Sequence, residues 1–308
     1  MSAQTRQQRG FLLGVLAYVL WGAFPLYWPL LKPSGAVEIL AHRVVWSLLT
    51  MAVVVAVSGR LAQVRALMTN VRATRLLAVA AVTIAVNWGT YIYGVNDHRV
   101  VETSLGYFIN PLVTVLLAVI VLGERLRPAQ WLALGIGAVA VLAIAIEYGR
   151  PPWIALILAF SFGTYGLLKK KADVDAVESL TFETIVLAPI ALGYLIWLGA
   201  QGEQHFTNHG VGHAALIMTT GIVTAVPLLC FGAAAIRVPM TTIGLLQYLA
   251  PILQFLLGVF ALHEHMTPMR WVGFGLVWIA LAIFTTDALR HARAVNAGIS
   301  ATELQAQT

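Results

Sequence analysis

The chain has 308 residues, of which 59% are hydrophobic and only 10% are charged, and its mean hydropathy is +0.83. Soluble domains carry roughly 25% charged residues, so this composition excludes a water-soluble protein and requires that much of the surface face lipid. The net charge of +6 does not indicate a nucleic-acid partner, because the basic residues are scattered through short loops. The only cysteine is Cys230, so no intrachain disulfide can form.

Ten apolar segments are predicted to be membrane-spanning helices, since a bilayer core about 30 Å thick needs roughly 20 apolar residues in a helix. Arg6 and Arg9 precede the first segment as in a signal peptide, but no small-residue cleavage site follows it, so we expect it to be retained. The expected spans lie near residues 11–31, 36–58, 76–97, 100–122, 128–147, 152–168, 178–199, 213–236, 240–262 and 268–289.

The basic residues predict the orientation of these spans. With the N-terminus inside, fourteen of the 19 Lys and Arg residues lie in cytoplasmic segments and four in external ones, as the positive-inside rule requires. We therefore expect a multi-pass protein of the inner (plasma) membrane with both termini in the cytoplasm. Residues 291–308 are polar and are predicted to form a short disordered tail.

An internal repeat appears when the sequence is shifted by 140 positions. The residues that coincide include Pro111 with Pro251, Glu124 with Glu264, Pro128 with Pro268, Trp131 with Trp271 and Gly135 with Gly275. Because five spans per copy is an odd number, the second copy enters the membrane upside down. We expect an all-α fold of ten transmembrane helices in two inverted five-helix repeats, residues 10–149 and 150–290, which is typical of alternating-access transporters. A duplication without a role in transport is the alternative.

Several motifs resemble the RarD subfamily of EamA-type transporters, in the drug/metabolite transporter superfamily. They are EILAHR, SLGYFINPLV, VLGER, GIVTAVPLLCF and LQYLAP, and the resemblance extends over residues 8–290. It implies an inner-membrane permease that exports small metabolites or drugs, such as a chloramphenicol-type drug or an amino-acid-like metabolite. It also favours protons as the coupling ion.

Polar and aromatic residues inside the spans are candidates for a substrate cavity, because lipid tolerates amides and hydroxyls poorly. Helix packing is the alternative explanation for them. In the first span, we expect Trp21 to face the cavity and Trp28 to anchor the membrane interface. The candidate cavity residues are Trp21, Asn87, Tyr91, Tyr107, Asn110, Gln247 and Gln254.

Two charges lie inside spans at positions that the repeat makes equivalent, Arg43 and Glu183. A charge in the bilayer centre costs at least about 2.5 kcal/mol, so each should face the protein interior. Their depths, estimated at 1.5 Å per helical residue, differ by about 10 Å, so we do not expect a direct ion pair. We expect Arg43 to pair with Glu102 at the outer end of the cavity, and Glu183 to pair with Lys169 or Arg237 at the inner end. Fixed salt bridges that only hold the fold are the alternative to gates.

Other motifs give little indication of catalysis or of a bound metal. No GxxxxGK[ST] motif is present, and the helix that would align His205, His209 and His213 as zinc ligands is interrupted by glycines. We expect no cofactor, no metal and no enzymatic activity. The expected partners are the lipid bilayer and a small-molecule substrate, with the protein as a monomer or homodimer. An intramembrane enzyme for lipid-linked substrates and a scaffold or sensor are the rival functions.

Overall fold

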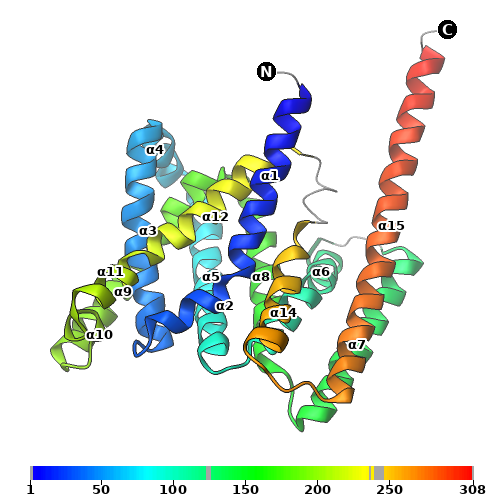
Figure 1. The fold of residues 1–308 in the computed structure, drawn as a ribbon. Coiled ribbons are helices and arrows are strands. Elements are labelled where there is room, and N and C mark those ends of the chain that lie inside the picture. The colour runs from blue at the N-terminus through cyan, green and yellow to red at the C-terminus, as the bar shows by residue number, and fades with distance from the viewer. Residues whose placement is uncertain (1–2, 123–125, 236, 239–245, 307–308) are drawn as a thin grey trace. The chain divides into compact units, whose positions relative to one another are not determined.

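The computed structural model describes residues 3–122, 126–235, 237–238 and 246–306, and these residues form helices and connecting loops without a strand (Figure 1). The chain divides into two compact units. Unit 1 comprises Met1–Asn110 and Trp153–His265, and unit 2 comprises Pro111–Pro152 and Met266–Thr308. The boundary falls at Pro111, a proline inside helix α6 (Val100–Leu122), which removes a backbone hydrogen bond there.

Unit 1 contains most of the helices. In chain order they are α1 (Ala3–Gly22), α2 (Phe24–Tyr27), η1 (Trp28–Leu31), α3 (Ala36–Ser58), α4 (Leu61–Thr69), α5 (Val71–Asn96), the first half of α6, α8 (Trp153–Ala172), α9 (Ala176–Ala200), α10 (His205–Asn208), α11 (Gly210–Met218), α12 (Thr220–Ala235), α14 (Leu249–Leu256) and η2 (Leu257–Ala261).

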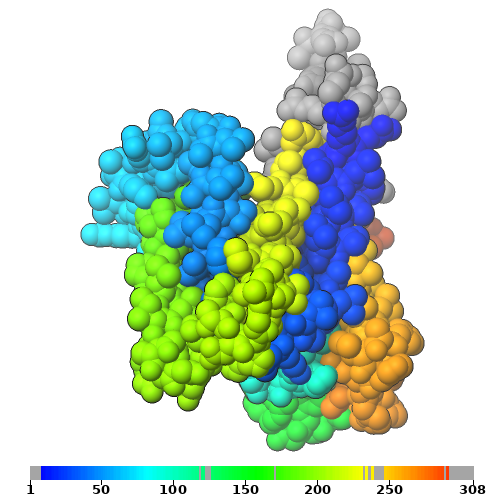
Figure 2. Space-filling view, turned by 60° about the vertical axis from the view of Figure 1, so that its left-hand side comes forward, coloured from blue at the N-terminus to red at the C-terminus, as the bar shows by residue number. Residues whose placement is uncertain are grey.

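Helix α3 is central in the packing of unit 1, because α5, α9 and α12 all lie against it. Figure 2 shows α12 between α1 and α3 on one face of this unit. The approach of α12 to α3 depends on Gly221, where a Cβ would lie 2.3 Å from the carbonyl oxygen of Trp46. Only glycine permits such close contact between the two backbones.

The first predicted span is broken. The helical segments Gln8–Gly22 and Phe24–Leu31 meet at an angle of 42°. Pro25 lacks an N–H, so the carbonyl of Trp21, one turn earlier, cannot receive its usual helical hydrogen bond. The Nε2 of Gln254 in α14 donates to this carbonyl instead, at 3.1 Å. A side chain from a distant helix thereby stabilises the break.

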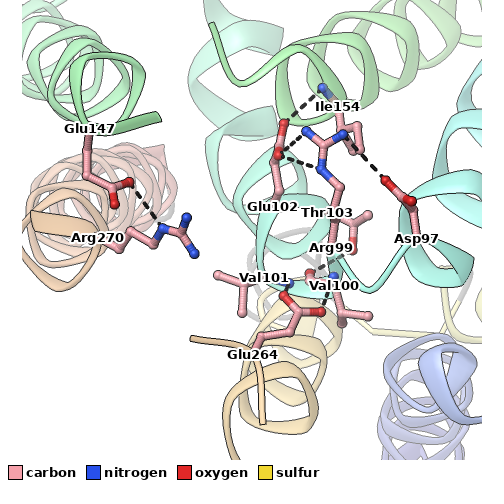
Figure 3. Close-up of polar contacts among 10 residues, drawn as sticks. All are labelled: Asp97, Arg99, Val100, Val101, Glu102, Thr103, Glu147, Ile154, Glu264 and Arg270. Atoms are coloured by element: carbon pink, nitrogen blue, oxygen red, sulfur yellow. Dashed lines mark hydrogen bonds and ion pairs between the residues drawn. The ribbon is translucent and has the colours of Figure 1, made fainter. Parts of the chain in front are cut away.

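Unit 2 contains the second half of α6, α7 (Pro128–Tyr148) and α15 (Pro268–Ala306), and α7 packs along α15. Arg270 near the start of α15 donates from Nε to the Glu147 carboxylate at 3.1 Å (Figure 3). Helix α15 continues to Ala306, whereas the sequence predicted a disordered tail from residue 291. The tail is rich in alanine and contains leucine, glutamate and glutamine, all good helix formers.

Seven helices of the described chain are long and apolar enough to cross a membrane, or eight if the broken α1–η1 segment is counted as one span. The apolar helices Trp153–Lys169 and Leu249–Ala261 are shorter. The first residues of the predicted span 240–262 lie outside the described residues. The structure therefore shows an all-helical multi-pass membrane protein, and the count of ten spans stays a prediction.

Candidate substrate site around Arg43

Arg43 lies in α3 within unit 1, with only 3% of its surface exposed. Its Nε donates to the hydroxyl of Thr224 in α12 at 2.8 Å. Three aromatic rings surround the guanidinium carbon, with centroids at 3.9 Å for Trp88, 5.0 Å for Trp28 and 5.9 Å for Phe24. We call these five residues the Arg43 site.

The aromatic rings explain how a buried cation is tolerated at this position. Arg43 lies seven residues after the start of α3, about 10 Å along the helix. Desolvated cation–π contacts contribute about 2 kcal/mol, which offsets part of the cost of burying the charge. Among the residues that the structure describes, no carboxylate lies within ion-pair distance of Arg43.

Glu102 was expected to pair with Arg43, and this prediction is wrong. Glu102 accepts hydrogen bonds from Arg99, at 2.5 Å from Nη2, and from the backbone N–H of Ile154 at 3.2 Å (Figure 3). Arg99 is only three residues away, immediately before the start of α6, so it reaches the carboxylate without crossing the site. Asp97 lies on the other side of Arg99, at 3.8 Å.

Two predicted cavity residues, Tyr91 and Tyr107, lie next to the Arg43 site, because Tyr91 packs against Phe24 at a ring-centroid distance of 6.5 Å and Tyr107 packs against Tyr91 in turn. Their ring centroids are 5.7 Å apart. The hydroxyl of Tyr107 donates to Oδ1 of Asn87 at 3.1 Å. Asn87 donates in turn to the carbonyl of Leu158 and to Ser161, both at 3.0 Å, so protein groups occupy its amide and it joins α5 to α8. The hydroxyl of Tyr91 is buried without a hydrogen-bond partner among the described residues.

The remaining predicted cavity residues are divided between other parts of unit 1. Trp21 packs edge-on against Tyr18, with ring centroids 5.2 Å apart. Gln254 donates a hydrogen bond to the carbonyl of Trp21, and within the described chain its Oε1 has no hydrogen-bond partner. The same is true of Oδ1 of Asn110, the last residue of this part of unit 1. Gln247 is partly buried just before α14.

Glu183 in α9 is 1% exposed and forms the ion pair that the sequence predicted with Lys169 of α8, at 2.9 Å. Ser179 donates to the same carboxylate at 2.8 Å, and the hydroxyl of Tyr165 donates to it at 3.1 Å. Lys169 also contacts Ser179. The expectation that Arg43 and Glu183 are not direct partners is confirmed, because each has its own set of contacts.

Glu264, which follows η2, binds the start of α6 within unit 1. Its carboxylate accepts hydrogen bonds from the backbone N–H groups of Val100, at 2.5 Å, and Val101, at 2.9 Å (Figure 3). A carboxylate at a helix N-terminus satisfies unpaired N–H groups and interacts favourably with the helix dipole. Glu124, the equivalent residue of the first repeat, lies outside the described residues.

The three histidines considered as zinc ligands lie on two helices, since α10 ends at Asn208 and α11 begins at Gly210, which has a φ of +83°. His205 instead contacts the Glu38 carboxylate through Nδ1 at 2.7 Å. Within the described residues, no group of three His, Cys, Asp or Glu side chains could hold a metal ion.

Sequence reasoning missed the aromatic residues that surround Arg43. Trp28 was expected at the membrane interface, but it is fully buried against the guanidinium. Trp88 follows the predicted cavity residue Asn87 directly in the sequence, yet no signal marked it as a partner of Arg43. Thr224 is separated from Arg43 by 181 positions in the sequence, and only the packing of α12 on α3 brings them together.

The family model of the EamA-like transporter family matches the chain twice, over residues 8–146 and 151–286. The chain belongs to this family. Within it, the chain belongs to the RarD subfamily: it is 59% identical over 301 residues to "Protein RarD" of Streptomyces exfoliatus, which covers 98% of this chain and 96% of the relative. It is also 43% identical to "Protein RarD" of Escherichia coli K12, over 93% of this chain and 97% of the relative.

A solved structure titled "Crystal structure of protein" has a similar fold, with a TM-score of 0.58 and 18% identity, and covers 89% of this chain and 96% of its own. Together with the membrane-crossing helices, the family membership shows that this protein is a membrane transporter. Such relatives indicate a protein that is not an enzyme.

Proposed function

We propose that the protein is a secondary permease that exports small metabolites or drugs across the bacterial inner membrane by alternating access. The observation that carries this proposal is the Arg43 site, a buried charge among aromatic rings in a protein of a transporter family. Ionisable residues within transmembrane helices are costly, and they commonly mark a substrate or ion pathway.

The proposed architecture is that of two inverted five-helix repeats, with ten spans and both termini in the cytoplasm. The two matches of the family model and the excess of basic residues in the predicted cytoplasmic loops support this arrangement. The proposed partners are the bilayer and a small-molecule substrate, and the proposed oligomeric state is a monomer or a homodimer.

Buried ion pairs at the two ends of unit 1 are the proposed gates. Helix α5 follows the end of α3 and leads into the start of α6, so the start of α6 lies at the same end of the unit as the start of α3. The ion pair between Arg99 and Glu102 lies at that end, beside the carboxylate of Glu264 that caps α6, whereas the ion pair between Glu183 and Lys169 lies at the other end, near the start of α9. If the contacts at one end of unit 1 open while those at the other end stay closed, Arg43 is exposed to one side of the membrane at a time.

Protons are the proposed coupling ion, and Glu183 is the proposed carrier. Its carboxylate is buried and accepts three side-chain hydrogen bonds, so protonation would weaken its contact with Lys169 and favour opening of that gate.

Flux into proteoliposomes tests the proposal. The purified protein would be reconstituted, and the uptake of a metabolite and drug panel would be measured with and without an imposed pH gradient. We expect saturable flux of at least one compound that responds to the gradient and is absent from protein-free liposomes. A protein that inserts correctly but moves no compound under any gradient would contradict the proposed function.

A further inference from the structure

We propose that the Arg43 site binds the carboxylate of a small monoanion with a flat, apolar body. This inference rests on the proposed function, because it names the class of substrate that the permease carries.

The first argument is that Arg43 has no protein counter-ion. Every buried carboxylate of unit 1 in the described chain has a basic partner: Glu38 has His205, Glu102 has Arg99, Glu178 has Arg60 and Glu183 has Lys169. Arg43 is the one Lys or Arg side chain among the described residues that is buried, and it has none. A cation that served only to hold the fold would be expected to have a fixed partner, as these acids do.

The second argument comes from the hydrogen-bond donors that are left over. Within the described chain, the only hydrogen bond from the Arg43 side chain is that from Nε to Thr224, so both Nη groups remain available. Nε1 of Trp28 and the hydroxyl of Tyr91 are also buried without a partner among the residues described. Trp28 and Tyr91 belong to one hydrophobic cluster. The Trp28 ring centroid lies 5.0 Å from the guanidinium carbon, and the Tyr91 ring packs against Phe24, whose own ring centroid lies 5.9 Å from that carbon.

These groups select the chemistry of the ligand. Guanidinium and indole nitrogens donate hydrogen bonds and do not accept them, so the complementary group has acceptor oxygens. A carboxylate matches the planar fork of an arginine in a bidentate arrangement. The site contains one positive charge, so a phosphate dianion would bring a second negative charge into an apolar region without compensation.

The surrounding rings select the shape of the rest of the ligand. The rings of Trp28, Phe24, Tyr91 and Tyr107 contact one another in that order, with successive centroids 5.3, 6.5 and 5.7 Å apart. Flat apolar groups stack against such rings in offset or edge-on arrangements. The site is closed in this structure, so one gate must open before a ligand can enter.

Matched acids and amides test the inference on the purified full-length protein. The probes are benzoate, phenylacetate, cinnamate and indole-3-acetate, each compared with its neutral primary amide, and binding is measured from the shift in thermal unfolding across a concentration series. We expect at least one acid to raise the midpoint while its amide does not. Hydrogen bonds to charged groups contribute about 1.5–3 kcal/mol, so Arg43→Gln should weaken binding of that acid by about 10- to 150-fold.

Three variants complete the test. Arg72→Gln, at an exposed arginine in α5, is the matched control and should bind the acid like the wild-type protein. Tyr91→Phe keeps the ring and Trp28→Phe keeps an aromatic side chain, but both remove an unpartnered donor, and each should weaken binding several-fold even if Arg43→Gln fails to insert.

The outcomes separate this inference from the proposed function. Binding of no acid, equal binding of acids and amides, or unchanged binding in Arg43→Gln would overturn the inference. If the protein transports neutral compounds into proteoliposomes and the Arg43→Gln variant transports them normally, the inference is wrong but the proposed permease function is supported. If acids bind through Arg43 but no compound is transported, the proposed permease function is wrong but the inferred binding site is supported.

Discussion

The ion pair between Lys169 and Glu183 should show strong energetic coupling in a double-mutant cycle with Lys169→Met and Glu183→Gln. At the observed 2.9 Å, Coulomb's law with an effective dielectric constant of about 20 gives roughly 6 kcal/mol of attraction before desolvation is subtracted. Lys169→Met leaves a carboxylate that is 1% exposed without its cation, and removing one partner of a buried pair costs about 3–5 kcal/mol.

Glu183→Gln should lower the free energy of unfolding by less than Lys169→Met does. The Lys169 side chain is 22% exposed, so in Glu183→Gln its amine can turn towards water, and we expect a loss of about 1–2 kcal/mol. The double variant leaves neither charge unpaired. Its loss of stability should therefore fall about 2 kcal/mol short of the sum of the single losses.

Equilibrium unfolding in detergent with a thiol-reactive dye provides the assay, because Cys230 is the only cysteine and lies in the apolar helix α12. Lys171→Met, at an exposed lysine of the same helix end, is the control and should change stability by less than about 0.5 kcal/mol. If the loss of stability in the double variant equals the sum of the single losses within about 0.5 kcal/mol, the reasoning is refuted, because the two side chains would then be energetically independent.

Three further predictions concern the packing and the caps of unit 1. Glu264→Gln keeps the shape of the cap on α6 but removes its charge, and should cost about 1 kcal/mol and speed hydrogen exchange at the first amides of α6. Tyr91→Phe should leave the unfolding midpoint unchanged or raise it, because its buried hydroxyl has no partner among the described residues; a clear fall in the midpoint would contradict this. Gly221→Ala should destabilise by about 1–3 kcal/mol because the new methyl group meets the Trp46 carbonyl, whereas Gly193→Ala in α9, with no atom within 4 Å, should be neutral or stabilising in the same unfolding assay.

The sequence was sufficient to predict a helical membrane protein and which helices carry the buried charges. Composition and span length depend only on the local chain, so the apolar helices were predictable. The depths of Arg43 and Glu183 along their helices were also enough to predict that the two side chains do not form an ion pair, because the rise per residue of a helix is nearly constant.

The partners of the charges were only partly predictable. Lys169 was expected beside Glu183 because both lie near the predicted inner ends of their spans. Glu102 was assigned to Arg43 by depth alone, and the assignment failed because Arg99, one helical turn away, reaches that carboxylate first. Cation–π partners such as Trp88 depend on how helices rotate against one another, which residue spacing does not reveal.

Accessibility of a cysteine beside Arg43 tests the central claim most directly. Ser47 lies one turn from Arg43 on α3, is fully buried and has no hydrogen-bond partner in the described chain, so Ser47→Cys in a Cys230→Ser background is a small change. The measurement is its labelling by a membrane-impermeant methanethiosulfonate in right-side-out and inside-out vesicles, with Lys171→Cys as a control that should react from one side only. Alternating access through the Arg43 site predicts labelling of residue 47 from both sides. Labelling from one side alone, or from neither, would contradict it.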